Sequence, residues 1–400
     1  MLAGRHGHVR RGRPGTILIQ QAHCAARTVP VNVCRTQLVI LVSRKSDGIR
    51  TRHREQSMAN IKDVARAADG SISTVSHVLR GTAPITPAVQ SRVRRAAEAL
   101  GYRPNPLGRA LLQGRTQAVG MLVSDITNPF FGQLARALER PLGRAGYEVL
   151  LCNTDYDRAR EQAFVETLVS RRVAAVAMCL GHATLDLLHT LAAAQVPAVV
   201  HWHASRPPDE LTEGLPSVRL VGIDIAAGLL QAAEHLYRLG HRRVALLTGP
   251  ADFDAAESRR AAFVTAALCV GIEPADVTCL RGDFRIESGR RTTRALLRDH
   301  TRPLPTAIVA GNDVMAIGAM QALREAGLHV PRDLSVIGFD DSLFASSYCP
   351  SLTTVCLPAY RMGQLTGRLL YALLEGRAAD GDQHIVLPTR LIVRESTGPV

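Results

Sequence analysis

A short stretch at residues 72–77 carries side chains that could hydrogen-bond nucleic-acid bases. Its sequence is Ile-Ser-Thr-Val-Ser-His, so hydroxyl and imidazole groups alternate with apolar side chains. At the N-terminal end of a helix, short polar side chains of this kind can reach base edges in the DNA major groove, as in the second helix of a helix-turn-helix. The spacing alone equally permits a three-helix bundle with no DNA role.

Motifs of common catalytic sites are absent from the sequence. It contains no Walker lysine loop, no GxSxG elbow, no HExxH helix and no paired metal ligands. His201 and His203 flank Trp202, but one HxH without further ligands is weak evidence for a metal. The eight cysteines form no CxxC pair, which argues against a structural zinc site. We therefore expect neither an enzyme nor a cofactor.

Three short helical patterns surround residues 72–77. Apolar residues recur at helical spacing from Ile61, and Ser71 is a good N-cap for the second helix. Pro87, directly after a threonine, opens the third helix, and Gly101 closes it. Three helices in so short a segment predict a small bundle.

After residue 118, short apolar runs alternate with amphipathic helical stretches. The runs expected to be strands are 119–123, 149–151, 173–178, 198–200, 220–223, 244–247, 277–280, 307–309 and 336–337. Such alternation predicts parallel sheets with helices on both faces. Because the segment is too long for one sheet, we expect two similar lobes.

Basic charge is concentrated at the front of the chain. Residues 1–57 hold 11 Lys+Arg against 2 Asp+Glu, and residues 58–116 hold 9 against 3, within a net charge of +13 for all 400 residues. This asymmetry suggests that the N-terminal part meets a polyanion and that the remainder is an ordinary globular body. No apolar run reaches the length of a membrane span, so we expect no membrane partner.

Four segments follow from these patterns. Residues 1–57 show no fold, and they are either a disordered basic arm or, as we favour, sequence upstream of translation from Met58. Residues 58–102 form the helical headpiece, residues 103–117 a linker with a short hinge helix, and residues 118–400 the two-lobed domain.

Residues 60–115 resemble the headpiece of the lactose-repressor family of bacterial regulators. The matching sequence is NIKDVARAADGSISTVSHVLRG, continued by ITPAVQSRVRRAAEALGYRPNPLGRALLQGRT. The resemblance continues, in the family's order, through ITNPFF, GYEVLLCNTD, LGHRRVALLTGP, ESRRAAF, AGNDVMAIGAMQALREAGLHVP, LSVIGFDD and PSLTTV. It implies a small all-α helix-turn-helix headpiece followed by an α/β two-lobed, periplasmic-binding-protein-like effector domain.

The function implied by this resemblance is regulation of transcription. We expect a cytoplasmic homodimeric repressor that binds double-stranded operator DNA, with an affinity controlled by a small polar effector such as a sugar or a related metabolite. A periplasmic binding protein would share the two lobes, but it would need an export signal directly before them and no headpiece.

Three kinds of DNA contact are implied by the resemblance. Ile72, Ser73 and His77 are expected to contact base edges in the major groove, although His77 could also be a solvated helix residue. Thr74, Ser76 and Arg80 are expected to contact phosphates. The hinge leucine that enters the minor groove and bends the DNA is Leu111.

The headpiece departs from the family pattern at three points. Asp69-Gly70 stands where the family has glycine followed by an apolar residue, so the turn glycine is shifted by one position. Gly108 replaces the usual hinge alanine, at a helix cost of about 1 kcal/mol, and Arg80 replaces the usual asparagine. The first two departures are expected to weaken operator binding.

Effector contacts are implied for seven residues. Phe130 and Phe131 fall at the edge of the cleft, where an aromatic face can stack on a sugar or base, although Phe131 could equally be a core residue. Arg259 and Asp313 match the charged pair that hydrogen-bonds polar effectors, with a surface arginine and a helix N-cap as the alternatives. The remaining positions are Trp202, Phe253 and Phe284. Trp202 stands where many members carry a sugar-binding aspartate, so it could be a stacking platform or plain packing.

Overall fold

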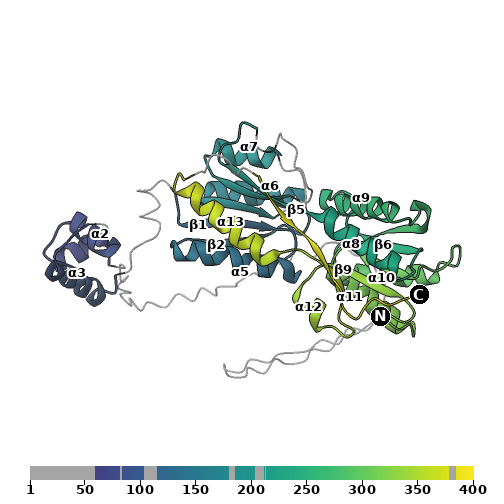
Figure 1. The fold of residues 1–400 in the computed structure, drawn as a ribbon. Helices are drawn as coiled ribbons and strands as arrows, with labels where there is room; N and C mark the ends of the chain where they lie inside the picture. The colour runs from purple at the N-terminus through teal and green to yellow at the C-terminus, as the bar shows by residue number, and fades with distance from the viewer. Residues whose placement is uncertain are drawn as a thin grey trace, which may run out of the picture. The chain divides into compact units, whose positions relative to one another are not determined.

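The structure, a computed structural model, describes residues 59–81, 83–102, 115–179, 185–202, 211, 213–377 and 384–400 (Figure 1). The expectations for residues 1–57, for Gly108 and Leu111 of the hinge, and for His203 lie outside these ranges.

The headpiece consists of three helices, as the sequence predicts. They are α1 (Ile61–Ala67), α2 (Ile72–Arg80) and α3 (Pro87–Ala99). Asn60 accepts hydrogen bonds from the first backbone N–H groups of α1, and the Ser71 hydroxyl accepts one from Thr74 N at 3.0 Å at the start of α2. Pro87 occupies the first turn of α3, while the preceding threonine makes no capping hydrogen bond. The helices bury one apolar cluster formed by Val64, Ala65, Ala68, Val75, Val78, Val93 and Ala97.

The turn between α1 and α2 places its left-handed residue at Asp69. Asp69 has φ +44°, whereas Gly70 does not have a positive φ. Two backbone bonds, Gly70 N to Ala65 O at 3.0 Å and Asp69 N to Arg66 O at 3.3 Å, form a Schellman motif at the end of α1. The position that favours glycine is therefore occupied by aspartate, one residue before the glycine.

The first lobe is a six-stranded sheet in the order β11-β5-β4-β3-β1-β2. Its strands are β1 (Ala118–Val123), β2 (Glu148–Asn153), β3 (Ala175–Cys179), β4 (Ala198–Trp202), β5 (Val218–Asp224) and β11 (His384–Pro388), all paired in parallel. Its helices are α5 (Pro129–Arg144), α6 (Arg158–Ser170), α7 (Leu185–Ala193) and α13 (Ala359–Leu374). Figure 1 shows α13, from late in the chain, lying along α5.

The second lobe repeats this plan with strand order β12-β10-β9-β8-β6-β7. Its strands are β6 (Val244–Thr248), β7 (Val277–Arg281), β8 (Ala307–Ala310), β9 (Ser335–Asp340), β10 (Thr353–Cys356) and the antiparallel β12 (Arg390–Ile392). Its helices are α8 (Ile225–Arg238), α9 (Asp254–Cys269), the 3-10 turn η2 (Pro274–Asp276), α10 (Ile286–Arg298), α11 (Asp313–Glu325) and α12 (Leu343–Ser347).

Three segments connect the lobes. The chain passes from β5 into α8 at residues 224–225, returns between β10 and α13 at 357–358, and crosses again at Thr389 between β11 and β12. The Thr389 hydroxyl donates to Asp224 O at 2.5 Å and accepts from Gly228 N at 3.0 Å, which ties the third crossing to the first. Strands β10, β11 and β12 were not anticipated from the sequence.

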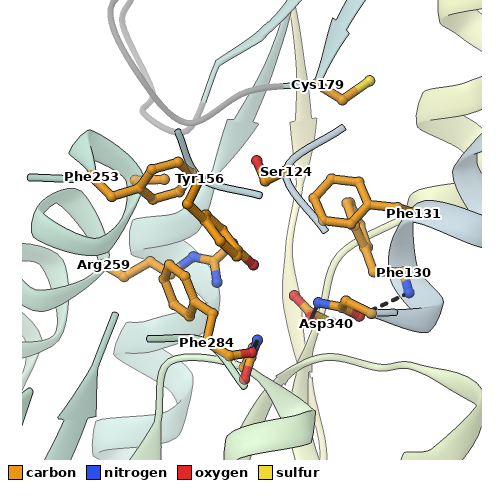
Figure 2. Close-up of a pocket in the computed structure, with 12 residues that line it drawn as sticks. Ser124, Phe130, Phe131, Tyr156, Cys179, Phe253, Arg259, Phe284 and Asp340 are labelled. Atoms are coloured by element: carbon orange, nitrogen blue, oxygen red, sulfur yellow. Dashed lines mark hydrogen bonds between the residues drawn. The ribbon is translucent and has the colours of Figure 1, made fainter. Parts of the chain in front are cut away.

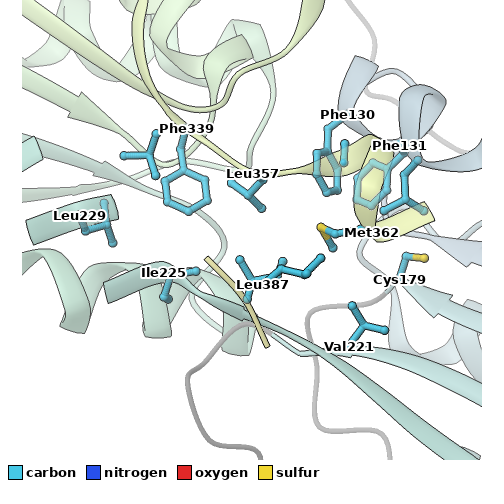
Figure 3. Close-up of a cluster of buried hydrophobic side chains, with 14 of the residues drawn as sticks. Phe130, Phe131, Cys179, Val221, Ile225, Leu229, Phe339, Leu357, Met362 and Leu387 are labelled. Atoms are coloured by element: carbon cyan, nitrogen blue, oxygen red, sulfur yellow. The ribbon is translucent and has the colours of Figure 1, made fainter. Parts of the chain in front are cut away.

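A buried apolar cluster continues across the crossings (Figure 3). Ile225 and Leu357 come from the first two crossing segments, and Leu387 is the penultimate residue of the strand that leads to the third. On one side they meet Phe339 of the second lobe, and on the other Met362 of the first. This continuous packing holds the inner ends of the two sheets together and positions the cavity described below.

Candidate DNA-reading helix and effector cavity

Helix α2 presents its polar residues on the face opposite the headpiece core. Val75 and Val78 are buried, while Ser73 is exposed, and Ser76 and His77 are partly exposed. The large apolar side chain of Ile72, at the first turn, is 45% exposed. An apolar side chain beside hydroxyl and imidazole groups at a helix N-terminus can contact thymine methyl groups and base edges.

Cationic side chains lie on the neighbouring helix. Arg92, Arg94 and Arg95 of α3 are exposed, and Arg92 donates to the backbone oxygen of Asp69 at 3.3 Å. Exposed guanidinium groups suit phosphate contacts. Arg80 belongs to α2, but its side chain is outside the part that the structure describes.

A cavity of about 370 Å³, including the solvent at its mouth, lies between the two lobes (Figure 2). It is lined by Ser124, Asn128, Phe130, Phe131, Tyr156 and Cys179 of the first lobe and by Phe253, Ala255, Arg259, Phe284, Asn312 and Asp340 of the second. Aromatic faces combined with a few polar groups are typical of a small-molecule site.

Five aromatic rings form two walls of the cavity. Phe130 and Phe131, at the start of α5, meet edge to face with centroids 5.2 Å apart. Opposite them, the Tyr156 ring lies 5.1 Å from Phe253 and 5.8 Å from Phe284. Both walls offer π faces to the apolar side of a ring-shaped ligand.

Arg259 supplies the positive charge of the site. Its guanidinium lies 4.2 Å from the Phe339 ring centroid and donates through Nη1 to Gly311 O at 2.6 Å. Its buried Nε has no hydrogen-bond partner among the described residues. Burial lowers the pKa of Arg259, and the nearby Asp340 carboxylate opposes this shift. Arg259 lines the cavity, and a guanidinium carries five N–H donors, so this side chain can donate to a ligand.

The carboxylate that lines the cavity is Asp340, not the predicted Asp313. Asp340 Oδ2 accepts a hydrogen bond from Asn128 Nδ2 at 3.0 Å, across the cleft. Asp313 lies behind the lining, where its two oxygens accept from Thr354 Oγ1 at 2.6 Å and Ser342 N at 2.7 Å. Its carboxylate is therefore already used to hold the loop that follows β9.

Burial raises the pKa of both acids. The pKa of Asp340 rises to about 6, because desolvation outweighs the opposing Arg259 charge and the Asn128 hydrogen bond. The pKa of Asp313 is also raised, first by burial and then by the neighbouring Asp340 charge. Asp340 is thus the acid that can carry charge near neutral pH beside the cavity.

Five of the seven predicted effector residues line the cavity, namely Phe130, Phe131, Phe253, Arg259 and Phe284. Trp202 does not; it ends β4, packs against the core of the first lobe, and leaves its buried indole N–H without a hydrogen-bond partner among the described residues. Sequence reasoning missed Ser124, Asn128, Tyr156, Cys179, Ala255, Asn312 and Asp340. Asn128, Asn312 and Asp340 stand inside the quoted motifs ITNPFF, AGNDV and IGFDD, which could have identified them.

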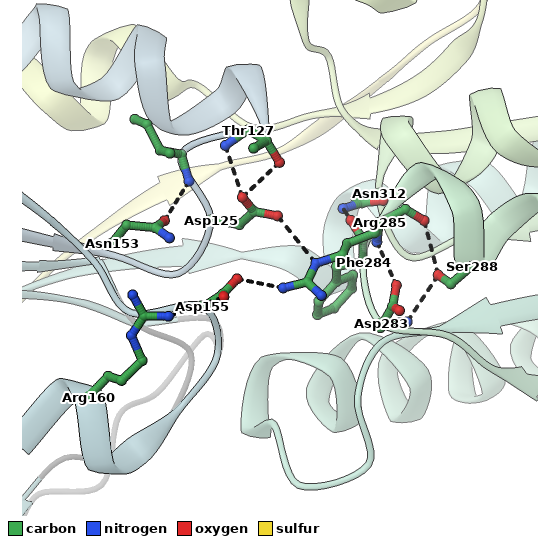
Figure 4. Close-up of polar contacts among 11 residues, drawn as sticks. Asp125, Thr127, Asn153, Asp155, Arg160, Asp283, Phe284, Arg285, Ser288 and Asn312 are labelled. Atoms are coloured by element: carbon green, nitrogen blue, oxygen red, sulfur yellow. Dashed lines mark hydrogen bonds and ion pairs between the residues drawn. The ribbon is translucent and has the colours of Figure 1, made fainter. Parts of the chain in front are cut away.

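Polar contacts join the lobes at the rim of the cavity (Figure 4). Arg285 of the second lobe donates to Asp155 Oδ1 at 2.5 Å and lies 3.9 Å from Asp125 Oδ2, both acids belonging to the first lobe. Asp155 also pairs with Arg160 at 3.1 Å. These contacts, with Asn128–Asp340, fix the separation of the lobes in this conformation.

Comparison with known proteins decides the family. Residues 60–105 match the model for bacterial regulatory proteins of the lacI family, and residues 233–397 match a periplasmic binding protein-like domain. The ribose operon repressor of Escherichia coli (strain K12) is 36% identical over 322 residues, which cover 77% of this chain and 91% of that protein. The chain belongs to the lacI family.

Solved structures agree with this assignment. The lac repressor dimer bound to operator and the anti-inducer ONPF aligns with a TM-score of 0.72 and 28% identity, over 85% of this chain and 99% of that one. A lacI-family regulator from Enterococcus faecium with bound ribose aligns with a TM-score of 0.62 and 27% identity, over 71% and 99%. This lacI-family chain is therefore a DNA-binding transcriptional regulator, not an enzyme.

None of the helices in the described part of this lacI-family chain is long and apolar enough to cross a bilayer. Within the same residues, no group of three or more His, Cys, Asp or Glu side chains is arranged to hold a metal ion.

Proposed function

We propose that this regulator is a homodimeric repressor whose operator affinity is controlled by a single-ring sugar, or a metabolite of similar chemistry, bound in the cavity between the lobes. The observation that carries the proposal is the combination of two aromatic walls with Arg259 and Asp340 in one interlobe cavity. The relatives named for ribose and the regulator with bound ribose support a sugar of this size.

The chemistry of the cavity favours a polyhydroxylated ring. The apolar face of a sugar stacks on aromatic rings, while its hydroxyl groups both donate and accept hydrogen bonds. Asp340 would accept from a hydroxyl and Arg259 would donate to one, while the amide oxygens of Asn128 and Asn312 already cap α5 and α11. In this assignment Asp340 takes the role first expected of Asp313.

Base readout is proposed for Ile72, Ser73 and His77 at the exposed start of α2. Thr74, Ser76 and Arg80 would contact phosphates, and Leu111, which is outside the described residues, would enter the minor groove at the operator centre. Phosphate contacts set the register on the duplex, and base contacts set the sequence preference.

A dimer follows from the limited reach of one headpiece. A single recognition helix contacts few base pairs, so two copies on half-sites about 10 bp apart supply the affinity and specificity of a repressor. The lac repressor relative is a dimer on its operator. Because its target is the bacterial chromosome, we place the regulator in the cytoplasm.

A mobility-shift titration tests the proposal. The purified full-length chain is mixed with DNA from upstream of its gene, and D-ribose, other pentoses and hexoses are then added. We expect a salt-sensitive complex whose affinity changes with at least one single-ring sugar, and we expect Arg259→Gln to retain the complex but lose that response. A protein that binds the DNA with no response to any sugar would contradict the effector assignment.

A further inference from the structure

One cavity wall comes from an unusual turn after β2. Asp155 and Tyr156 are consecutive non-glycine residues with φ +62° and +63°, a left-handed conformation that L side chains rarely adopt. Such strain persists only where surrounding contacts hold it, and it is concentrated at ligand clamps. We call residues 154–157 the β2 hook.

Contacts on both residues hold the hook against the opposite lobe. The Asp155 carboxylate pairs with Arg285 of the second lobe and with Arg160 of its own lobe. The Tyr156 ring meets Phe253 and Phe284 of the second lobe. Asp157 then caps α6, accepting from Ala159 N at 2.8 Å, so the chain is fixed on both sides of the tyrosine.

The hydroxyl of Tyr156 points toward the middle of the cavity (Figure 2). Burial raises the pKa of Tyr156, and the negative charges of Asp125 and Asp340 raise it further. The phenol therefore keeps its proton at neutral pH and can donate a hydrogen bond to a ligand oxygen.

We propose that Tyr156 sets the size limit of the effector: its ring closes one side of the cavity so that one sugar ring fits, and a two-ring sugar is excluded. This inference rests on the proposed function and names a specificity residue for it. Tyr156 lines the cavity beside Phe253 and Phe284, and an alanine at position 156 would open the cavity toward these two rings.

Three variants separate the possible roles. Tyr156→Ala removes the wall, Tyr156→Phe keeps the wall and removes the hydroxyl, and Tyr237→Ala removes a tyrosine of α8 that is outside the cavity. Each full-length protein is titrated calorimetrically with a panel of pentoses and hexoses and with the disaccharides cellobiose and maltose.

We expect the unmodified protein to bind a single-ring sugar and neither disaccharide. Tyr156→Ala should bind that sugar about fivefold more weakly, since a stacking face is lost, and should gain measurable binding of a disaccharide. Tyr156→Phe should still exclude disaccharides, and Tyr237→Ala should match the unmodified protein. Circular dichroism spectra are compared to show that each variant is folded.

Several results would overturn the inference. Disaccharide binding by the unmodified protein would show that Tyr156 imposes no size limit, and the sugar-effector proposal would stand without its restriction to one ring. Tighter binding of the single-ring sugar by Tyr156→Ala would mean that the tyrosine occupies part of the sugar site. If Tyr156→Ala binds every sugar as the unmodified protein does, Tyr156 does not contact the sugar. If no sugar binds the unmodified protein, the proposed function fails, and the inference fails with it.

Discussion

Arg285 and Asp155 belong to different lobes and form an ion pair with an Nη2–Oδ1 distance of 2.5 Å at the rim of the effector cavity. Both side chains are nearly half exposed, so the pair contributes at most about 1 kcal/mol to folding. Because it exists only when the lobes are close, its energy favours the closed arrangement specifically. The pair is thus suited to tune closure with little influence on global stability.

We expect Arg285→Gln to weaken effector binding about threefold, because a smaller fraction of molecules would be in the closed, binding-competent state. The unfolding free energy should change by less than about 1 kcal/mol. Calorimetric titration and thermal denaturation measure the two effects. Arg290→Gln is the matched control, since Arg290 pairs with Glu325 inside one lobe. Equal losses of effector affinity in both variants would show that the Arg285–Asp155 pair has no specific role in lobe closure.

The sequence predicts some helices and strands of this protein better than others. Helical and strand periodicity identified the headpiece and nine strands, because those segments carry local apolar patterns. It did not reveal that β11 returns to the first sheet while β12 joins the second, since a pattern specifies the type of an element and not its sheet. The sheet to which β11 and β12 each belong is therefore known only from the structure.

The site was predictable to a similar degree. The resemblance proposed Arg259 and four phenylalanines that line the cavity, but it also proposed Trp202 and Asp313, which do not. Asp313 and Asp340 are close enough to interact. The structure shows that Asp313 bonds Thr354 and the backbone of Ser342, whereas Asp340 lines the cavity. Tyr156 carried no signal, because a left-handed tyrosine is not what local sequence favours.

Effector binding should weaken in acid through Asp340. Its pKa is raised to about 6, so it is mainly ionised at pH 7.5 and protonated at pH 5, where a charge-assisted hydrogen bond to the effector is lost. We expect affinity to fall severalfold between these pH values. Asp340→Asn should bind weakly at every pH, with no such dependence. An unmodified protein with a flat pH profile would contradict the assignment.

The same titration affects stability with the opposite sign. The folded pKa of Asp340 lies above the unfolded value of about 4, so its stability contribution is full below pH 4 and is lost as the pH rises through about 6. The polar groups that face the Asp340 carboxyl are Arg259, Asn128 and Asp313. Chemical denaturation of the unmodified protein and of Asp340→Asn between pH 4 and 7 isolates this contribution. Effector binding and the Asp340 contribution to stability should therefore change in opposite directions.

Asp69→Gly should stabilise the headpiece. Asp69 occupies the left-handed position that ends α1. Glycine has no Cβ and adopts this conformation without strain, so the free energy of unfolding should rise by about 0.5–1 kcal/mol. Hydrogen exchange at the α1 and α2 amides of the full-length chain measures the change. Gly70→Ala is the matched control, because a Cβ there would lie 3.8 Å from Ala68 O in ordinary contact. Faster exchange in Asp69→Gly would show that the aspartate side chain is needed.

His77→Ala should reduce operator affinity by about 10- to 100-fold, corresponding to about 1–3 kcal/mol for a lost base contact. The slope of affinity against salt concentration should not change, because that slope counts phosphate contacts. Fluorescence anisotropy on operator and on unrelated DNA measures both quantities. His189→Ala, on the exposed side of α7, is the control. Equal losses on operator and unrelated DNA would instead assign His77 to a phosphate.

Close packing of α5 against α13 depends on Gly363. A Cβ at that position would lie 2.3 Å from Leu134 O and 2.8 Å from Ala137 Cβ, so an alanine cannot be accommodated unless the helices separate. Overpacking of this kind costs about 1–3 kcal/mol, which exceeds the gain of about 1 kcal/mol from replacing a helical glycine.

Gly132 of α5 provides the opposite case, because nothing lies within 4 Å of its Cβ position. We expect Gly363→Ala to lower the melting temperature by several degrees and Gly132→Ala to raise it by about 2–4 °C, the shift for about 1 kcal/mol in a domain of this size. Both substitutions remove one glycine from a helix of the first lobe, so differences in the unfolded chain cancel. Differential scanning calorimetry measures both. A Gly363→Ala protein as stable as Gly132→Ala would mean that the two helices can move apart without cost, and that their contact does not fix the first lobe.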